Sequence, residues 1–229
     1  MRIGTWNLQN DDRIDDKKKF LLAQNCDVWL LTEVCEELLE DSGQRFAHFN
    51  AHWSSGDIRT GTKYAAVLSV QELEPVEEDI HFASAAAVIN GITYCSTILP
   101  WKGVKKNSDP WTGSDHAEMT GNVLASLLTN LPKENLVWGG DWNHSFIGTE
   151  WCGSDIGRTH LCTALKELEL HVPTASLAGK GNKCFSIDHI ALPRHWIVNS
   201  VERIAVATHS DHDAYVVDAC QLEKPVPKS

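Results

Sequence analysis

The sequence predicts an α/β fold in which mixed β-sheets pack into a sandwich. Strand-like apolar runs outnumber helical patterns along the 229 residues. The dipeptide Asn90-Gly91 lies between two such runs and is typical of a tight antiparallel hairpin. Helical segments separate other strands, as crossover connections do. Hairpins together with crossovers favour a mixed sandwich over a purely parallel doubly wound sheet.

The first part of the chain alternates strand and helix patterns. In chain order, we expect a strand over 2–8, a helix beginning within 11–19, a strand over 27–34, two strands within 46–70, and an exposed edge or loop over 71–79. Asp15 and Asp16 precede the apolar residues of the expected helix, and early acids suit a helix start. Residues 28–31 are apolar on both sides of the strand, which indicates a sheet covered on both faces.

The rest of the chain continues the alternation. We expect strands over 85–90 and 92–99, a loop over 100–115, a helix over 116–131, a strand over 136–138, a loop over 144–158, a helix over 159–170, a loop over 173–183, and strands over 184–192, 201–207 and 214–220. The loop over 100–115 is long for a compact domain, and such loops are often functional. A hydrophobic content of 42% predicts one domain over 1–221, followed by a short polar tail over 222–229.

Charge and cysteine content restrict the function classes. The formal net charge of -11 argues against a protein that binds long double-stranded nucleic acid, because such proteins neutralise many phosphates with basic side chains. The cysteines are odd in number and lack CxxC spacing, which argues against a disulfide framework or a zinc site and favours reduced thiols. There is no targeting pattern and no run of about 18 apolar residues. We therefore expect a cytoplasmic protein without a membrane span.

Five segments carry polar residues of the kinds that bind a metal or move a proton. Three of them end strand-like apolar runs, a fourth completes the set, and the last places an Asp-His pair just before the apolar run 214–217. The five segments are Thr5-Trp6-Asn7, Leu30-Leu31-Thr32-Glu33, Gly139-Gly140-Asp141-Trp142-Asn143, Ser186-Ile187-Asp188-His189 and Thr208-His209-Ser210-Asp211-His212-Asp213. Each segment alone is a weak signal. Together and in this order, they predict an active site.

Asn7, Glu33 and Asp211 are the candidate metal ligands. Carboxylate and amide oxygens are the hard ligands that Mg²⁺ prefers, and this ion is often held by one or two carboxylates plus water and substrate phosphate. Each residue alone also has a structural explanation, since Asn7 and Asp211 suit turns or caps and Glu33 suits a surface ion pair. Their joint occurrence favours a metal site.

Asp141, Asn143, Asp188 and His212 are the candidate catalytic residues. Asp141 and Asn143 alternate in sequence, so they point to the same side of an extended segment. A carboxylate that positions or deprotonates water, beside an amide donor, suits hydrolysis; an Asx-rich turn is the alternative. His212 is a candidate general base, and Asp188 is a candidate to orient it as carboxylates do in triads. A lone histidine would favour a structural role.

The ordered set TWN, LLTE, GGDWN, SIDHI and SDH resembles the endonuclease/exonuclease/phosphatase family of metal-dependent hydrolases, over residues 3–218. The resemblance implies a four-layered sandwich of two packed mixed β-sheets with helices on the outside, and a site at one end of the sheets. It places Asn7 and Glu33 at the metal-site positions and Asp211 at an acid that serves a second metal. The implied cofactor is Mg²⁺, for which Mn²⁺ is expected to substitute.

The same resemblance assigns the chemistry. It implies that Asp141 orients the attacking water, that Asn143 helps to bind the phosphate, and that Asp188 pairs with the catalytic His212. The reaction would be in-line attack of water on phosphorus, with the metal and His212 sharing the negative charge that builds in the transition state.

One departure from the family concerns the predicted strand that ends at Pro100. Abasic-site endonucleases carry a tyrosine shortly before this proline, whereas this chain has Ile98, and many other members have a histidine in this strand. The abasic-endonuclease subtype is therefore disfavoured. Loop cations can form a locally basic rim instead: Lys102, Lys105, Lys106, Arg158, Lys180 and Lys183. Trp101, Trp111 and Trp151 in these loops are candidates to stack on bases, with loop anchoring as the alternative.

The leading hypothesis is an Mg²⁺-dependent phosphodiesterase, most readily a nuclease on DNA or RNA. The acidic charge favours short or single-stranded nucleic acid over long duplex as the partner. The first alternative is a phosphatase or phosphodiesterase for a small phosphorylated metabolite, nucleotide or lipid headgroup. The second is a catalytically silent binding module on the same fold, which is disfavoured because no motif position has lost its polar side chain.

Overall fold

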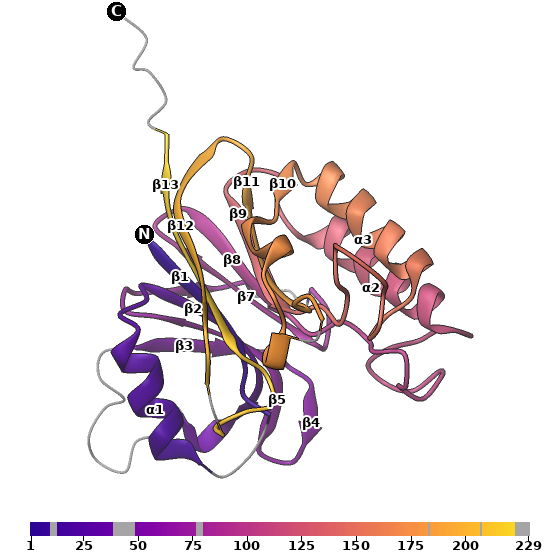
Figure 1. Cartoon of the computed structure of the whole chain (residues 1–229), viewed down its shortest axis with the longest axis horizontal. Helices are drawn as coiled ribbons and strands as arrows, with labels where there is room; N and C mark the ends of the chain where they lie inside the picture. The colour runs from indigo at the N-terminus through magenta and orange to yellow at the C-terminus, as the bar shows by residue number, and fades with distance from the viewer. Residues whose placement is uncertain (10–12, 39–48, 77–79, 183, 207, 223–229) are drawn as a thin grey trace, which may run out of the picture.

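The computed structural model describes residues 1–9, 13–38, 49–76, 80–182, 184–206 and 208–222. These residues form two β-sheets that face each other, with helices on the outer sides (Figure 1). Of the predicted tail, only Leu222 is among them. No helix of the described residues is long and apolar enough to cross a bilayer.

The first sheet is built from both ends of the chain. Its strands are β1 (Arg2–Asn7), β2 (Val28–Cys35), β3 (Asn50–Trp53), β4 (Asp57–Arg59), β5 (Thr62–Ser69), β12 (Trp196–Ile204) and β13 (Ala214–Gln221). They lie in the order β12-β13-β1-β2-β5-β3, with β4 paired to β5. β1 is parallel to β2 and antiparallel to β13, so the first and last strands of the described chain are neighbours in the middle of the sheet.

The second sheet is built from the middle of the chain. Its strands are β6 (Glu74–Pro75), β7 (Ser84–Ile89), β8 (Ile92–Thr97), β9 (Leu136–Asp141), β10 (Leu170–His171) and β11 (Asp188–Pro193), in the order β10-β11-β9-β8-β7-β6. The predicted hairpin is confirmed: Asn90 and Gly91 have φ values of 51° and 75°, and Ile89 pairs with Ile92. A two-residue hairpin turn of type I′ requires a positive φ at both central residues.

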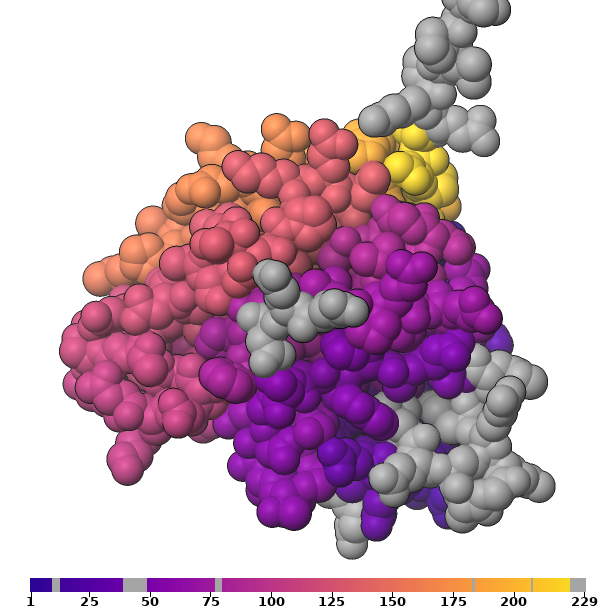
Figure 2. Space-filling model, turned by 180° about the vertical axis from the view of Figure 1, so that it is seen from behind, coloured from indigo at the N-terminus to yellow at the C-terminus, as the bar shows by residue number. Residues whose placement is uncertain are grey.

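Three helices of the described residues complete the four layers. They are α1 (Ile14–Ala23), α2 (His116–Asn130) and α3 (Asp155–Glu167). The short 3₁₀ segments η1 (Glu36–Leu38), η2 (Pro173–Ser176) and η3 (Lys180–Asn182) lie in connections between strands. Helix α1 lies on the first sheet, whereas α2 and α3 lie side by side on the second (Figure 1). Seen from behind, the indigo-to-purple segments and the magenta-to-orange segments of the chain lie against each other as one continuous surface (Figure 2). The predicted sandwich with outer helices is therefore confirmed.

Strand β2 shows how the sequence specifies the layers. Leu30 is part of the core between the two sheets, whereas Trp29 is part of the core beneath α1. Both side chains are fully buried. The strand is thus covered on both faces, as its unbroken apolar run predicts.

Several predicted boundaries differ from the structure. Strand β11 begins at Asp188 rather than at 184, and β12 spans Trp196–Ile204 rather than 201–207. Helix α3 begins at Asp155 rather than at 159, because the Ser154 hydroxyl accepts a hydrogen bond at 3.0 Å from the Gly157 N–H and so caps the helix earlier. The described part of the region 46–70 yields three strands instead of two, since the segment Asp57–Arg59 also pairs with β5.

Candidate active site

The strand register gathers the polar strand ends at one end of the two sheets. In the second sheet, Asp141 lies directly opposite Asp188 on the paired strands β9 and β11. In the first sheet, Asn7 ends β1 next to Thr32 of β2, and Glu33 follows. The two sheets meet here because the side-chain amide of Asn7 donates to the Asp141 carboxylate at 2.9 Å.

Glycines before Asp141 make this close approach feasible. A Cβ atom at Gly140 would lie 2.2 Å from the carbonyl oxygen of Thr97, and its φ of +123° is one that other residues rarely adopt. A Cβ atom at Gly139 would lie 2.7 Å from Leu30 Cδ1 of the facing sheet. The Gly139-Gly140 pair therefore lets the end of β9 approach both its neighbour strand and the opposite sheet.

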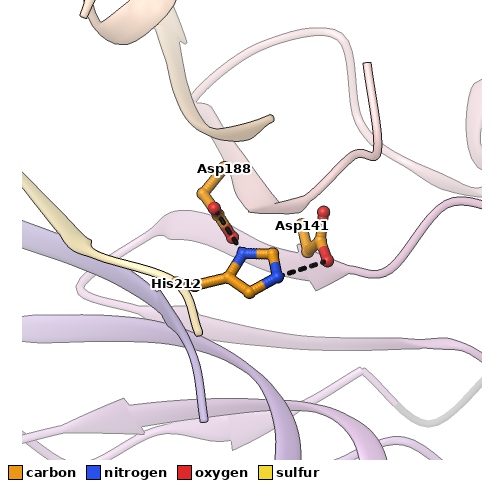
Figure 3. A group of neighbouring side chains, drawn as sticks. All are labelled: Asp141, Asp188 and His212. Atoms are coloured by element: carbon orange, nitrogen blue, oxygen red, sulfur yellow. Dashed lines mark hydrogen bonds and ion pairs between the residues drawn. The ribbon is translucent and has the colours of Figure 1, made fainter. Parts of the chain in front are cut away.

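His212 and Asp188 form a tight pair (Figure 3). His212 Nδ1 lies 2.7 Å from Asp188 Oδ2, while its Nε2 lies 3.9 Å from Asp141 Oδ2. Asp211 Oδ1 lies 3.9 Å from the same Nε2, on the solvent side, with 61% of its side chain exposed. The imidazole is thus held between two buried carboxylates and faces a third that is open to solvent.

A second hydrogen-bonded set joins the strand ends of the first sheet to Asp141. The amide nitrogen of Asn7 donates to Glu33 Oε1 at 3.0 Å as well as to Asp141. The backbone N–H of Asn143 donates to Asp141 Oδ1 at 3.0 Å. Glu33 and Asn143 have φ values of 53° and 51°. Left-handed backbone at non-glycine residues concentrates at functional sites.

Burial and mutual charge set the protonation of this cluster. Burial, reinforced by the Asp188 carboxylate, raises the pKa of Asp141 to about 7. Burial also raises the pKa of Asp188, against the opposing effect of His212. Burial alone would lower the pKa of His212, but the Asp188 and Asp141 carboxylates raise it to about 10. His212 therefore carries a proton at neutral pH and is able to donate it.

The oxygen-rich end of the sheets fits a divalent cation. Ligand atoms of Asp141, Asp188 and His212 lie within 4.8 Å of one another. Asp188 Oδ1 is buried without a hydrogen-bond partner among the described residues. Two buried carboxylates repel each other, and a cation compensates such charge. Because Asp188 Oδ2 and His212 bind each other, Glu33 and Asp141 supply further carboxylate oxygen atoms at this end of the sheets, and these are the donor type that Mg²⁺ takes. The side-chain oxygen of Asn7 accepts from the Gln9 N–H at 2.8 Å.

A cleft of about 460 Å³ opens beside His212 and Asp188. Its lining includes Trp101 and Trp151, which are 40% and 48% exposed, and also Lys180. Two of the predicted stacking residues therefore face the cleft. Lys102 and Lys105 are exposed on the loop that follows β8 and Trp101.

Other predicted substrate-binding residues have different surroundings. Trp111 is a correction: it is 2% exposed and packs edge-on against Tyr64 and Trp101, so it stabilises the loop from inside. Arg158 lies on α3 and binds Glu150 at 3.3 Å and the Gly148 carbonyl at 2.9 Å, so its guanidinium is paired with the loop that precedes this helix. Lys183 lies outside the described residues.

The structure adds three residues that the sequence patterns did not single out. Ser210 donates to the Asn7 carbonyl at 2.7 Å and accepts from the His212 N–H at 3.0 Å, which links the last motif to the first. Gln9 Oε1 accepts from the Asp211 N–H at 2.8 Å. The Cys152 thiol contacts Asn143 Oδ1 at 3.0 Å. Only Ser210 had a sequence signal, because it lies within a motif.

Solved structures match this chain over nearly its whole length. An endonuclease/exonuclease/phosphatase from Bacteroides vulgatus is 15% identical, with 96% of this chain and 98% of that chain covered and a TM-score of 0.68. An AP endonuclease from Archaeoglobus fulgidus is 16% identical, with 95% and 98% covered and a TM-score of 0.66. A mannosyl-6-phosphatase from Bacteroides thetaiotaomicron is 12% identical, with 96% and 99% covered and a TM-score of 0.65. No protein-family model and no curated protein sequence matches.

Proposed function

We propose that this chain, which has the fold of the endonuclease/exonuclease/phosphatase structures, is a cation-dependent hydrolase of phosphodiester bonds, with nucleic acid as the leading substrate class. The observation that carries the proposal is the convergence of Asp141, Asp188 and His212 beside an open cleft. Charged groups that are costly to bury, with perturbed pKa values and next to a cleft, are typical of a catalytic site.

Each residue of the cluster has a role in water attack on phosphorus. His212, held through Nδ1 by Asp188, donates from Nε2 to a phosphoryl oxygen as negative charge develops. Asp141 orients the attacking water. The side-chain amide of Asn143 binds a non-bridging phosphate oxygen.

Asn7, Glu33 and Asp211 are the proposed ligands of Mg²⁺, with Mn²⁺ as a substitute. A divalent cation bound there would stabilise the negative charge of the phosphoryl group and lower the pKa of a coordinated water. The side chain of Glu33 accepts from the Asn7 amide nitrogen, and this hydrogen bond holds the two residues side by side at the end of the first sheet.

Cation binding is testable without measuring activity. At Mg²⁺ concentrations of about ten to a hundred times Kd, the free energy of unfolding should rise by ~1.4 to 2.7 kcal/mol. Glu33→Gln should remove most of this increase, because it replaces a charged oxygen ligand with a neutral amide. Thermal unfolding with EDTA or with Mg²⁺ measures both. Glu134→Gln is the control, since Glu134 is exposed near the amino end of β9, away from the site. An equal Mg²⁺ response in all three proteins would contradict the assignment.

Nucleic acid is the leading substrate class because of the cleft rim. Trp101 and Trp151 present partly exposed indole rings beside the proposed catalytic residues, and stacking on such a ring contributes ~1 to 3 kcal/mol per base. Lys102 and Lys105 add local positive charge to an acidic protein. A rim of this kind suits unpaired bases, whose faces are accessible, better than a long duplex.

Activity is tested on a labelled single strand, a duplex, an RNA and bis(p-nitrophenyl) phosphate, each with Mg²⁺, Mn²⁺ or EDTA. Asp141→Ala and His212→Ala should each lower kcat at least ~10²-fold, because each removes a group that acts in the transition state. His195→Ala is the control, since His195 is exposed in the turn between β11 and β12. If both active-site variants hydrolysed the substrate as fast as the wild type, the proposed site would be contradicted.

The second candidate is a phosphatase or phosphodiesterase for a small phosphorylated metabolite. The cleft volume of about 460 Å³ favours it, because this volume is within the range of small-molecule sites. The similar fold of the mannosyl-6-phosphatase also agrees with it. Turnover of the small diester, with no cleavage of any nucleic acid, would select this candidate.

A further inference from the structure

We propose that Cys152 is a positioning residue that fixes the side-chain amide of Asn143 in the orientation needed to bind phosphate. This inference rests on the proposed function, because Asn143 is assigned to the phosphoryl group there. Cys152 comes from the loop between β9 and α3 and lines the cleft together with Asn143.

The orientation of the Asn143 amide follows from its partners. Its Nδ2 lies 2.8 Å from the backbone carbonyl of Leu99. A carbonyl only accepts hydrogen bonds, so the nitrogen and not the oxygen of the amide must face it. Asn143 Oδ1 then faces Cys152 Sγ at 3.0 Å, and the thiol must be the donor. The second hydrogen of Nδ2 is left for a ligand in the cleft.

The loop around Cys152 is rigidly held. Its carbonyl accepts from the Lys102 N–H at 2.8 Å, and its N–H donates to Glu150 Oε1 at 3.3 Å. The Glu150 side chain is 2% exposed, binds Arg158, and also accepts from the Ser145 and Gly153 backbone N–H groups at 3.1 Å. Arg158 therefore helps to hold the loop that contains Cys152, because it binds Glu150.

Gly153 allows the thiol to reach Asn143. A Cβ atom at this position would lie 2.8 Å from the backbone oxygen of Asn143 and 2.7 Å from the His144 ring. Only a residue without a side chain lets the loop approach this closely. The next residue on the N-terminal side, Cys152, is thereby brought over the Asn143 amide.

The thiol stays protonated under working conditions. Burial, reinforced by the Asp141 and Glu150 carboxylates, raises the pKa of Cys152 to about 12. A neutral thiol is a weak hydrogen-bond donor and a poor nucleophile, so a donor role fits this group and a covalent role does not.

The test compares side chains with and without a hydrogen-bond donor at position 152. Cys152→Val replaces the thiol donor with an apolar side chain, and should lower kcat on bis(p-nitrophenyl) phosphate about tenfold with little change in KM, because Asn143 acts in the transition state. Cys152→Ser restores a donor and should return kcat to within about threefold of wild type. Cys220→Val is the control, since Cys220 is exposed on β13. Thermal unfolding checks that all variants fold.

A second readout is independent of turnover. The Asn143 side-chain NH₂ resonances, assigned by their loss in Asn143→Ser, should shift in Cys152→Val and stay close to wild type in Cys152→Ser. Wild-type kcat and unshifted resonances in Cys152→Val would overturn the positioning role, and so would a serine variant as impaired as the valine variant. A wild-type protein that hydrolyses no phosphodiester refutes the proposed function instead, and the resonances then still decide whether the thiol orients the amide.

Discussion

The folded structure disfavours the ionised form of the Asp141 carboxyl group. Its pKa of about 7 lies above the value of about 3.9 for an unfolded chain. The folded state therefore binds this proton more tightly than the unfolded state does. The stabilisation that results is fully present below the unfolded pKa and is lost as pH rises through about 7.

Asp141→Asn should consequently stabilise the cation-free protein at pH about 8 by on the order of 1 to 2 kcal/mol, because the amide removes a buried charge that faces Asp188. The gain should shrink toward pH about 4, where the carboxyl group is neutral in the folded state. Urea unfolding in EDTA at both pH values measures this difference, with Glu134→Gln as the control. A variant less stable than wild type at the higher pH would contradict this interpretation.

The residues of the motifs are predictable because they lie near strand ends, and the strand pattern is visible in the sequence. Asn7 and Asp141 end strands, whereas Asp188 begins one. Trp111 was assigned wrongly because a loop tryptophan has the same sequence signature whether its ring faces solvent or the core. Cys152 gave no signal at all. Its contact with Asn143 depends on a loop path that is set by the buried Glu150 side chain and by Gly153, and no local periodicity encodes such a path.

Among the elements, helix α3 depends most clearly on one side chain. Ser154 caps its N-terminus, and the same hydroxyl lies 2.9 Å from His116 Nδ1. The helix thereby connects the loop that carries Cys152 to the start of α2.

Ser154→Ala should lower the free energy of unfolding by ~1 kcal/mol, because a capped backbone N–H loses its acceptor. Urea unfolding measures the change. Thr163→Ala is the matched control in the same helix, since Thr163 is exposed and alanine has the higher helix propensity, so its stability should stay equal or rise. Equal effects of the two substitutions would argue against the cap.

The central strands and the Asn90-Gly91 hairpin were predictable because burial on both faces and a special turn leave strong local signals. The start of α3 was not predictable, since the capping residue Ser154 belongs to a glycine-rich stretch that has the composition of a loop. The short strand Asp57–Arg59 was not either, because all its residues are exposed and only its pairing with β5 makes it a strand.

At the scale of the whole molecule the net charge is negative, yet Lys102 and Lys105 are exposed on the loop that follows Trp101, which lines the cleft. A polyanionic substrate is therefore expected to bind through a small number of contacts rather than through a broad basic surface.

Lys102→Ala combined with Lys105→Ala should weaken kcat/KM on a single strand and reduce its logarithmic salt slope by about 0.7 per lysine that contacts phosphate. Turnover of bis(p-nitrophenyl) phosphate should change little, because a small diester does not reach the rim. Lys133→Ala is the control, since Lys133 is exposed near the amino end of β9. Equal losses on both substrates would show that these lysines do not form a substrate rim.

The site takes Asp141, Asn143 and Asp188 from one sheet and His212 from the other, just before β13, the last strand of the described chain. β13 inserts between β12 and β1, so it is the strand that closes the first sheet. A growing polypeptide can complete the whole second sheet and still lack the imidazole that Asp188 is shaped to hold. The proposed catalytic cluster is therefore completed late in synthesis, and a prematurely terminated fragment that ends before His212 lacks the group proposed to donate to the phosphoryl oxygen.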